Sequence, residues 1–307
     1  MATHDHNKDD AVYYVPTNGW YPVFVAAAIF LSLAGVGHWL NLIKAGQPAN
    51  RGMLYVGVAM LAIVLFKWFT KVIAENHAGM LNPQVNRSFV WGMSWFIFSE
   101  VMFFLAFFGA LFYARNFAVP WIGGEGAKGI TGEYLWPNFS PTWPVLHNPD
   151  PTRFPNPSES MASRGISHWG SFLPFWNTVI LLSSSVTVHF AHTAVKESKR
   201  RLIQFWLFVT VALGVMFLLL QGYEYHHAYT ELGLTLGSGI YGSTFFILTG
   251  FHGFHVTLGA FILLMQFFRS LRGHFKPNDQ FGLEAASWYW HFVDVVWVCL
   301  FIFVYVL

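Results

Sequence analysis

One acidic side chain stands in the middle of a long apolar segment. Residues 88 to 114 are mostly apolar, and Glu100 is the only Asp or Glu among them. An ionised carboxylate near the centre of a bilayer costs about 2.5 to 3.5 kcal/mol even on permissive insertion scales. We therefore expect Glu100 to be a buried acid that faces protein or a cavity in its protonated form. Proton transfer is the chemistry that such a residue could support.

Two pairs of polar residues occur in later apolar segments. His252 and His255 are three positions apart in one, and His291 and Asp294 have the same spacing in the other. This spacing puts both members of a pair near one face of a helix. Two imidazoles could begin a copper, iron, zinc or haem site, but no further ligand is paired with them in the sequence. We favour interhelical hydrogen bonds for the histidine pair, and a shared hydrogen bond or lipid-headgroup contact for the other pair.

Further polar residues lie toward the ends of apolar segments. His192 follows His189 by three positions, and Glu224 closes the next segment, with His226 and His227 directly after it. We place Glu224 near the membrane interface, where water can solvate it, and assign it a structural role. The sequence predicts no catalytic and no metal-binding residue in this chain.

The composition indicates an integral membrane protein. Of the 307 residues, 55% are hydrophobic and 10% are charged, which is too little polar surface to cover a soluble core of this size. The net charge of +2 is too small to indicate nucleic-acid binding, and a single cysteine, Cys299, excludes an intrachain disulfide. Walker-type, HExxH, GxSxG and paired CxxC motifs do not occur, so no motif in the sequence indicates hydrolysis or nucleotide binding.

Seven apolar segments are long enough to cross about 30 Å of hydrocarbon as helices. They cover residues 21 to 43, 53 to 73, 88 to 114, 174 to 195, 202 to 224, 240 to 268 and 284 to 307. With the N-terminus inside, eleven Lys and Arg residues fall on the inner side and six on the outer side. Because cytoplasmic segments carry the excess of positive charge, we predict a cytoplasmic N-terminus and an outer C-terminus.

These spans divide the chain into five parts. Residues 1–19 form a polar inner tail, residues 20–80 hold the first two helices and residues 81–114 the third. Residues 115–173 form a long outer loop, and residues 174–307 hold the last four helices. Eight of the 14 prolines lie in the loop and exclude a long helix there. Four tryptophans in the loop favour contact with the membrane interface or a partner over a free tail: Trp121, Trp136, Trp143 and Trp169.

Four long motifs closely resemble subunit III of cytochrome c oxidase, the haem-copper terminal oxidase. They are FSEVMFFLAFFGALFY around Glu100, LGVMFLLLQGYEY at 213–225, YGSTFFILTGFHGFHVTLGAFIL at 241–263 and FGLEAASWYWHFVDVVWV at 281–298. The motifs occur in the order and with the spacing of that family. The resemblance covers nearly all of the membrane part, from about residue 20 to residue 307.

The resemblance implies an all-α polytopic membrane protein whose seven helices form a V-shaped bundle of two plus five, with phospholipids in the cleft. Family members of this kind carry no haem or copper themselves, and the haems and copper belong to partner subunits. The main partner is the catalytic subunit I, with subunit II and a small subunit IV as further partners, in a complex that oxidises cytochrome c. The subunit supports proton uptake and protects the binuclear centre from inactivation during turnover.

The motifs also imply roles for single residues. Glu100 matches the family's buried acid in its SEVxFF run. The histidine pair of the sixth span matches the HGxHV motif, and the polar pair of the seventh matches WYWHFVDVVW. The residues expected to be structural or to line lipid are His252, His255, His291, Asp294, His192 and Glu224.

The chain departs from the family pattern in three places. Residues 19–22 read GWYP where a PWP-like run is common, Lys71 stands where an acid is expected, and the 115–173 loop is longer than in mitochondrial members. The long loop favours a bacterial protein in the cytoplasmic membrane, with a periplasmic C-terminus. Subunit III of a quinol oxidase and a freestanding proton-coupled carrier remain alternatives.

Overall fold

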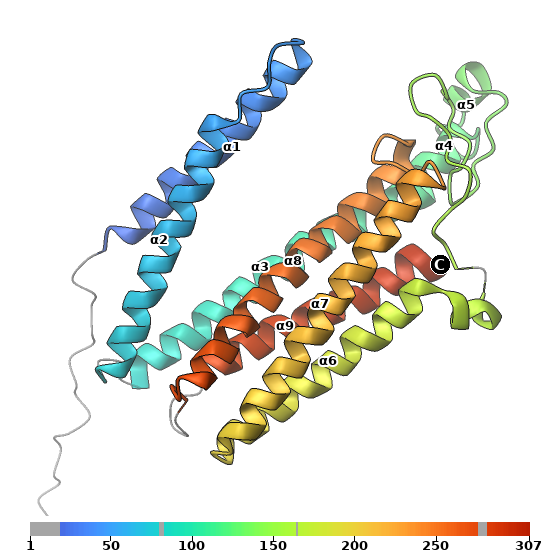
Figure 1. Cartoon of the computed structure of the whole chain (residues 1–307). Helices are drawn as coiled ribbons and strands as arrows, with labels where there is room; N and C mark the ends of the chain where they lie inside the picture. Colours follow the sequence, from blue (N-terminus) through green and yellow to red (C-terminus); the bar gives the residue numbers. More distant parts are fainter. Residues whose placement is uncertain (1–18, 80–82, 164, 276–280) are drawn as a thin grey trace, which may run out of the picture. The chain divides into compact units, whose positions relative to one another are not determined.

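The computed structural model describes residues 19–79, 83–163, 165–275 and 281–307, which contain no strand and are mostly helical (Figure 1). The predicted polar tail lies outside these ranges except for its last residue. The long helices are α1 (Tyr21–Lys44), α2 (Gly52–His77), α3 (Pro83–Tyr113), α6 (Leu173–Lys196), α7 (Arg200–Thr230), α8 (Gly239–Leu271) and α9 (Phe281–Leu300). Within the described ranges, seven helical segments are long and apolar enough to cross a membrane, so the predicted all-α fold with seven spans is confirmed.

Two spans run six or more residues past their predicted ends. The third continues through a π-helical turn, η1 (Ala114–Ala118), into α4 (Val119–Ile122), although we expected it to end at residue 114. Pro120 lies in the first turn of α4, where a missing N–H is tolerated, so it does not end the span. The fifth span was expected to end at residue 224, but α7 continues to Thr230 and ends shortly before Gly233. The φ of +60° at Gly233 favours glycine and suits a helix terminus.

The chain divides into two compact units, residues 1–91 and residues 92–307. In the first unit, α1 and α2 form an antiparallel hairpin (Figure 1). A Cβ at Gly35 would lie 2.5 Å from the backbone nitrogen of Leu54, and one at Gly57 would lie 2.5 Å from that of Ser32. The two glycines therefore let the backbones approach closely, as small residues do between membrane helices. The V-shaped arrangement of two plus five helices stays a prediction.

In the second unit, α6, α7, α8 and α9 form a four-helix ring in which each helix packs against the next and α9 returns to α6. Side-chain hydrogen bonds link neighbouring helices inside the ring. The Thr187 and Thr210 hydroxyls join α6 to α7 at 2.8 Å, and the Tyr225 and Thr249 hydroxyls join α7 to α8 at 2.7 Å. These bonds satisfy polar groups that would otherwise be costly in hydrocarbon.

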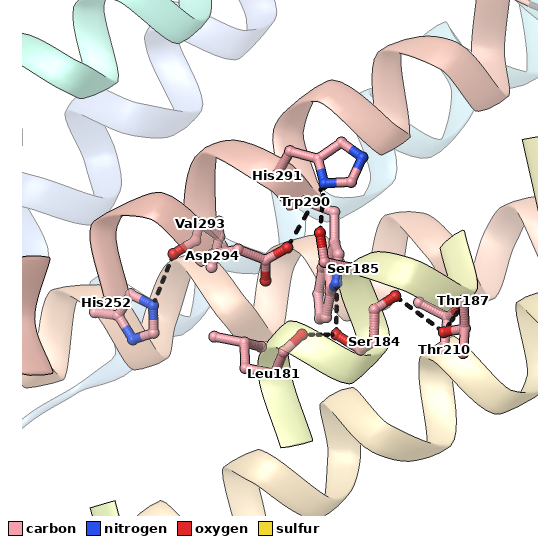
Figure 2. A network of polar contacts seen from close by, with 10 residues as sticks. All are labelled: Leu181, Ser184, Ser185, Thr187, Thr210, His252, Trp290, His291, Val293 and Asp294. Atoms are coloured by element: carbon pink, nitrogen blue, oxygen red, sulfur yellow. Dashed lines mark hydrogen bonds and ion pairs between the residues drawn. The ribbon is translucent and has the colours of Figure 1, made fainter. Parts of the chain in front are cut away.

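Trp290 of α9 lies inside this ring and is fully buried. Its indole N–H donates a hydrogen bond to Ser184 Oγ of α6 at 2.9 Å (Figure 2). Its ring faces Gly214 of α7 and Gly259 of α8, where an added Cβ would come within 2.7 Å and 2.9 Å of a ring carbon. One side chain of α9 therefore contacts all three other helices of the ring, and the two glycines provide its space.

The outer loop folds back onto the second unit. After α4, the described part of the loop contains only the short helices α5 (Ile130–Leu135) and η2 (Ile166–Ser171), as its prolines predict. The Ser158 N–H donates to the Leu232 carbonyl at 2.9 Å, beyond the end of α7. The Ser163 N–H donates to the carbonyl of Tyr305 at 2.6 Å, in η3 (Phe301–Val306), the π-helical end of the last span. Three loop tryptophans pack on the chain's own aromatic side chains: Trp121 on Tyr113 and Phe117, Trp143 on Tyr241, and Trp169 on Phe175 and Phe301.

We expect Gly214→Ala and Gly259→Ala each to destabilise the protein by about 1 to 3 kcal/mol, because the added methyl group would overlap the Trp290 ring. Gly222→Ala and Gly253→Ala are matched controls on the same two helices, since a Cβ there meets nothing within 4 Å. The controls should leave stability unchanged or raise it slightly, because alanine is the better helix former. Thermal unfolding in detergent, followed by circular dichroism, measures the difference. Equal shifts for both pairs would contradict this packing.

Candidate functional site

Aromatic rings and a polar contact join α3 to α8 within the second unit. Phe103 of α3 meets Phe251 of α8 edge to face, with ring centroids 5.1 Å apart. Phe104 lies against the ring of His255 at 5.0 Å. Glu100, one turn before these phenylalanines, places Oε2 at 3.0 Å from Nε2 of His255. The acid in the middle of the third span therefore has a histidine partner inside a layer of aromatic side chains.

The second nitrogen of His255 determines how protons are arranged in this contact. Its Nδ1 lies 2.6 Å from the carbonyl oxygen of Phe251. A carbonyl only accepts, so Nδ1 carries a hydrogen. Nε2 then either accepts from a protonated Glu100 or, in an imidazolium, donates to a carboxylate. The 3.0 Å contact thus needs a proton between the two atoms, and the neutral pair avoids burying two charges.

His252 has a different partner from His255. Its Nε2 lies 3.2 Å from the carbonyl oxygen of Val293 and donates to it (Figure 2). Its ring packs against those of Phe217 and Trp297, at centroid distances of 5.7 Å and 5.0 Å. Both histidines of the predicted pair therefore make interhelical hydrogen bonds, one to α9 and one to α3. Within the described residues, no three His, Cys, Asp or Glu side chains gather as metal ligands.

His291 and Asp294 lie close together but do not share a normal hydrogen bond. The His291 Nδ1 is 3.7 Å from Asp294 Oδ2, whereas it lies 2.7 Å from the Ser185 hydroxyl of α6 (Figure 2). Asp294 is only 3% exposed, so contact with lipid headgroups, one of the two expectations, is wrong for it. Sequence analysis missed Ser185, because a serine in the run Ser183 to Ser185 carries no signal of its partner.

The structure corrects the environment of Glu224. This residue is 2% exposed, so the expectation that interfacial water solvates it is wrong. The reason is that α7 continues beyond it to Thr230 and the loop packs over this end of the unit. His192, by contrast, is half-buried near the end of α6, with Glu284 of α9 among the charges around it.

Burial distinguishes the two roles expected for the polar residues, which are a structural role and the lining of a lipid site. The exposed fraction is between 1% and 6% for His252, His255, Asp294 and Glu224. These side chains face other helices, which favours a structural role over lining lipid. Each of the histidines in Figure 2 bonds to a neighbouring helix, so the arrangement works as a set of cross-links between spans.

We expect Glu100→Gln to preserve the protein's stability, because the glutamine amide can donate to Nε2 of His255 in place of the acid. Glu100→Leu should cost about 1 to 3 kcal/mol, because it leaves Nε2 buried without a donor. Adding His255→Phe to Glu100→Leu should recover much of that loss, since both polar partners are then gone. Glu100→Lys should impair assembly. Thermal unfolding of the variants in detergent provides the measurement.

The protonation of the pair has its own test. The infrared difference between wild type and Glu100→Gln at neutral pH should contain the carbonyl stretch of a protonated carboxyl group. A carboxylate band in its place would show that Glu100 and His255 form a charged pair, contrary to our expectation.

Comparison with known proteins identifies the family. The family model for cytochrome c oxidase subunit III matches residues 12–125 and 161–307. The unmatched residues between these ranges lie in the outer loop. Cytochrome c oxidase subunit 3 of Gazella subgutturosa is 35% identical over 300 residues, which cover 97% of this chain and 98% of the relative. The subunit of Bos taurus is 34% identical with the same coverage. The chain belongs to the cytochrome c oxidase subunit III family.

Proposed function

We propose that this chain is the non-redox subunit III of a proton-pumping cytochrome c oxidase. The observation that carries the proposal is the family match along almost the whole chain. The histidine geometry supports the absence of a redox centre in this chain. Both ring nitrogens of His255 already have hydrogen-bond partners, and Nε2 of His252 bonds to Val293. A metal would have to break these bonds and recruit further ligands.

The partners in this proposal are subunit I as the main contact, subunit II and a small subunit IV, with cytochrome c as substrate of the complex. The exposed apolar side chains of α3 support a membrane-embedded partner or lipid on that helix, since such side chains exclude water. They include Trp95, Phe98, Met102, Leu105 and Phe112. Haems and copper in the partner subunits supply the electron transfer, while this chain supports proton uptake and the stability of subunit I.

Bound phospholipids belong to the same proposal. An apolar groove between α7 and α8 supports acyl-chain binding on the second unit. It is lined by Phe208, Val211, Ala212, Val215, Met216, Leu219, Leu264 and Phe267. The charge bias along the sequence and the long outer loop support a bacterial cytoplasmic membrane, with the N-terminus in the cytoplasm and the C-terminus in the periplasm.

Gentle detergent removal of this chain from the purified complex tests the proposal. The remaining complex should keep its haem spectrum, its copper and its initial activity, but lose activity faster during turnover or take up protons more slowly. The extracted chain should show no visible absorption and no stoichiometric iron, copper or zinc. A complex taken through the same detergent steps with this chain retained is the control.

Two results would overturn the proposal. One is the departure of haem or copper together with the chain. The other is a depleted complex whose activity and proton uptake match those of the control throughout turnover.

A further inference from the structure

Several buried polar side chains in the second unit have no hydrogen-bond partner for their polar atoms among the described residues, and four of them form one group. These four contribute seven nitrogen and oxygen atoms and are at most 5% exposed. We call them the outer polar layer: Asn177 of α6, Gln221 and Glu224 of α7, and Tyr305 of η3. A buried polar atom without a partner costs its full desolvation, and hydrocarbon supplies no compensation.

The members of the outer polar layer lie near one another without bonding directly. The Tyr305 hydroxyl is close enough to the Glu224 carboxyl and the Gln221 amide to interact with both, yet no pair has hydrogen-bond geometry. Polar groups that lie near one another without a well-formed hydrogen bond can be joined by a bridging molecule.

The alignment of α6 with α7 places Asn177 at the same height along the helix axes as Gln221. The Thr187 and Thr210 hydroxyls, 2.8 Å apart, fix how the antiparallel α6 and α7 align. Asn177 lies ten residues from Thr187, and Gln221 lies eleven residues from Thr210 in the matching direction. At 1.5 Å per residue these separations are about 15 Å and about 16 Å, so the two amides are nearly level.

The outer loop closes this end of the unit. The Ser163 N–H donates to the backbone carbonyl of Tyr305, and the Met161 N–H donates to the Tyr241 hydroxyl at 2.9 Å. Both contacts hold the loop segment against residues of the second unit near the layer. The layer is therefore enclosed by three helices and a docked loop segment.

The mixture of donors and acceptors decides what the enclosed layer binds. Asn177 and Gln221 each present an NH2 donor and a carbonyl acceptor, and Tyr305 presents a hydroxyl that can do both. A metal cation would satisfy the oxygens but leave both NH2 groups unpaired. Water donates and accepts, and buried water typically makes about three hydrogen bonds to such groups.

We propose that the outer polar layer binds a cluster of internal water molecules that hydrogen-bond to Glu224, Gln221, Tyr305 and Asn177. These waters join the ends of α6, α7 and η3 beneath the loop segment that contains Met161 and Ser163. The site is separate from the Glu100–His255 pair and does not depend on the role of the chain in the oxidase.

A structure of the intact complex at a resolution that shows ordered water tests this site. We expect density peaks within hydrogen-bond distance of the Glu224 carboxyl and of the Gln221 and Asn177 amides. Side chains that bond directly to one another with no peak between them would overturn the proposal. A single strong peak coordinated only by oxygens would do so as well, because it would indicate a cation.

Matched variants extend the test. Gln221→Leu should remove at least one peak, because it deletes a donor and an acceptor of the layer. Gly222→Ala is the control, since it changes the next residue on the same helix and an added Cβ there meets nothing within 4 Å. The control should leave every peak in place. Unchanged peaks in Gln221→Leu would overturn the assignment, and if that variant does not assemble, the wild-type map decides.

Discussion

The packing of Trp290 is the constraint on which the second unit depends. Lipid chains are as apolar as the helix surfaces, so close packing and interhelical hydrogen bonds hold membrane helices together. Trp290 provides both, because it fits against Gly214 and Gly259 and bonds to Ser184. Its position also fixes the rotation of α9. That rotation turns the Val293 carbonyl toward His252, His291 toward Ser185, and the indole of Trp297 toward Thr178, which accepts from it at 2.9 Å.

The same logic explains the attachment of α3. Large aromatic side chains fill the space between it and α8, and Glu100 supplies a specific bond to His255 within that layer. An acid in the middle of a span is expensive unless it has a partner, so its partner specifies how the two helices are aligned. The acid that first indicated proton chemistry is also a structural cross-link. Both the neutral and the charged form of the Glu100–His255 pair fit the geometry, so the contact is compatible with proton chemistry as well as with a structural cross-link.

The sequence predicts the spans well because helix length in a membrane follows from apolar segments and bilayer thickness. It also identifies the polar residues that need partners, including Glu100, His255 and Asp294. It does not identify those partners, since a residue such as Ser185, which bonds to His291, is common and its rotation toward another helix depends on packing far along the chain. The burial of Glu224 was missed for a related reason: the length of α7 and the loop over its end are not visible in local hydropathy.

The central claim is that this chain is a haem-free subunit of a haem-copper oxidase, and that the contacts between its spans hold it together. Affinity purification of the tagged chain in mild detergent, followed by mass spectrometry and an optical spectrum, tests this claim most directly. The account predicts recovery of oxidase subunits I and II in constant ratio to this chain, with haem bound to them and oxidation of cytochrome c rather than quinol. Purification of the chain without those subunits, or with a Soret band of its own, would contradict it.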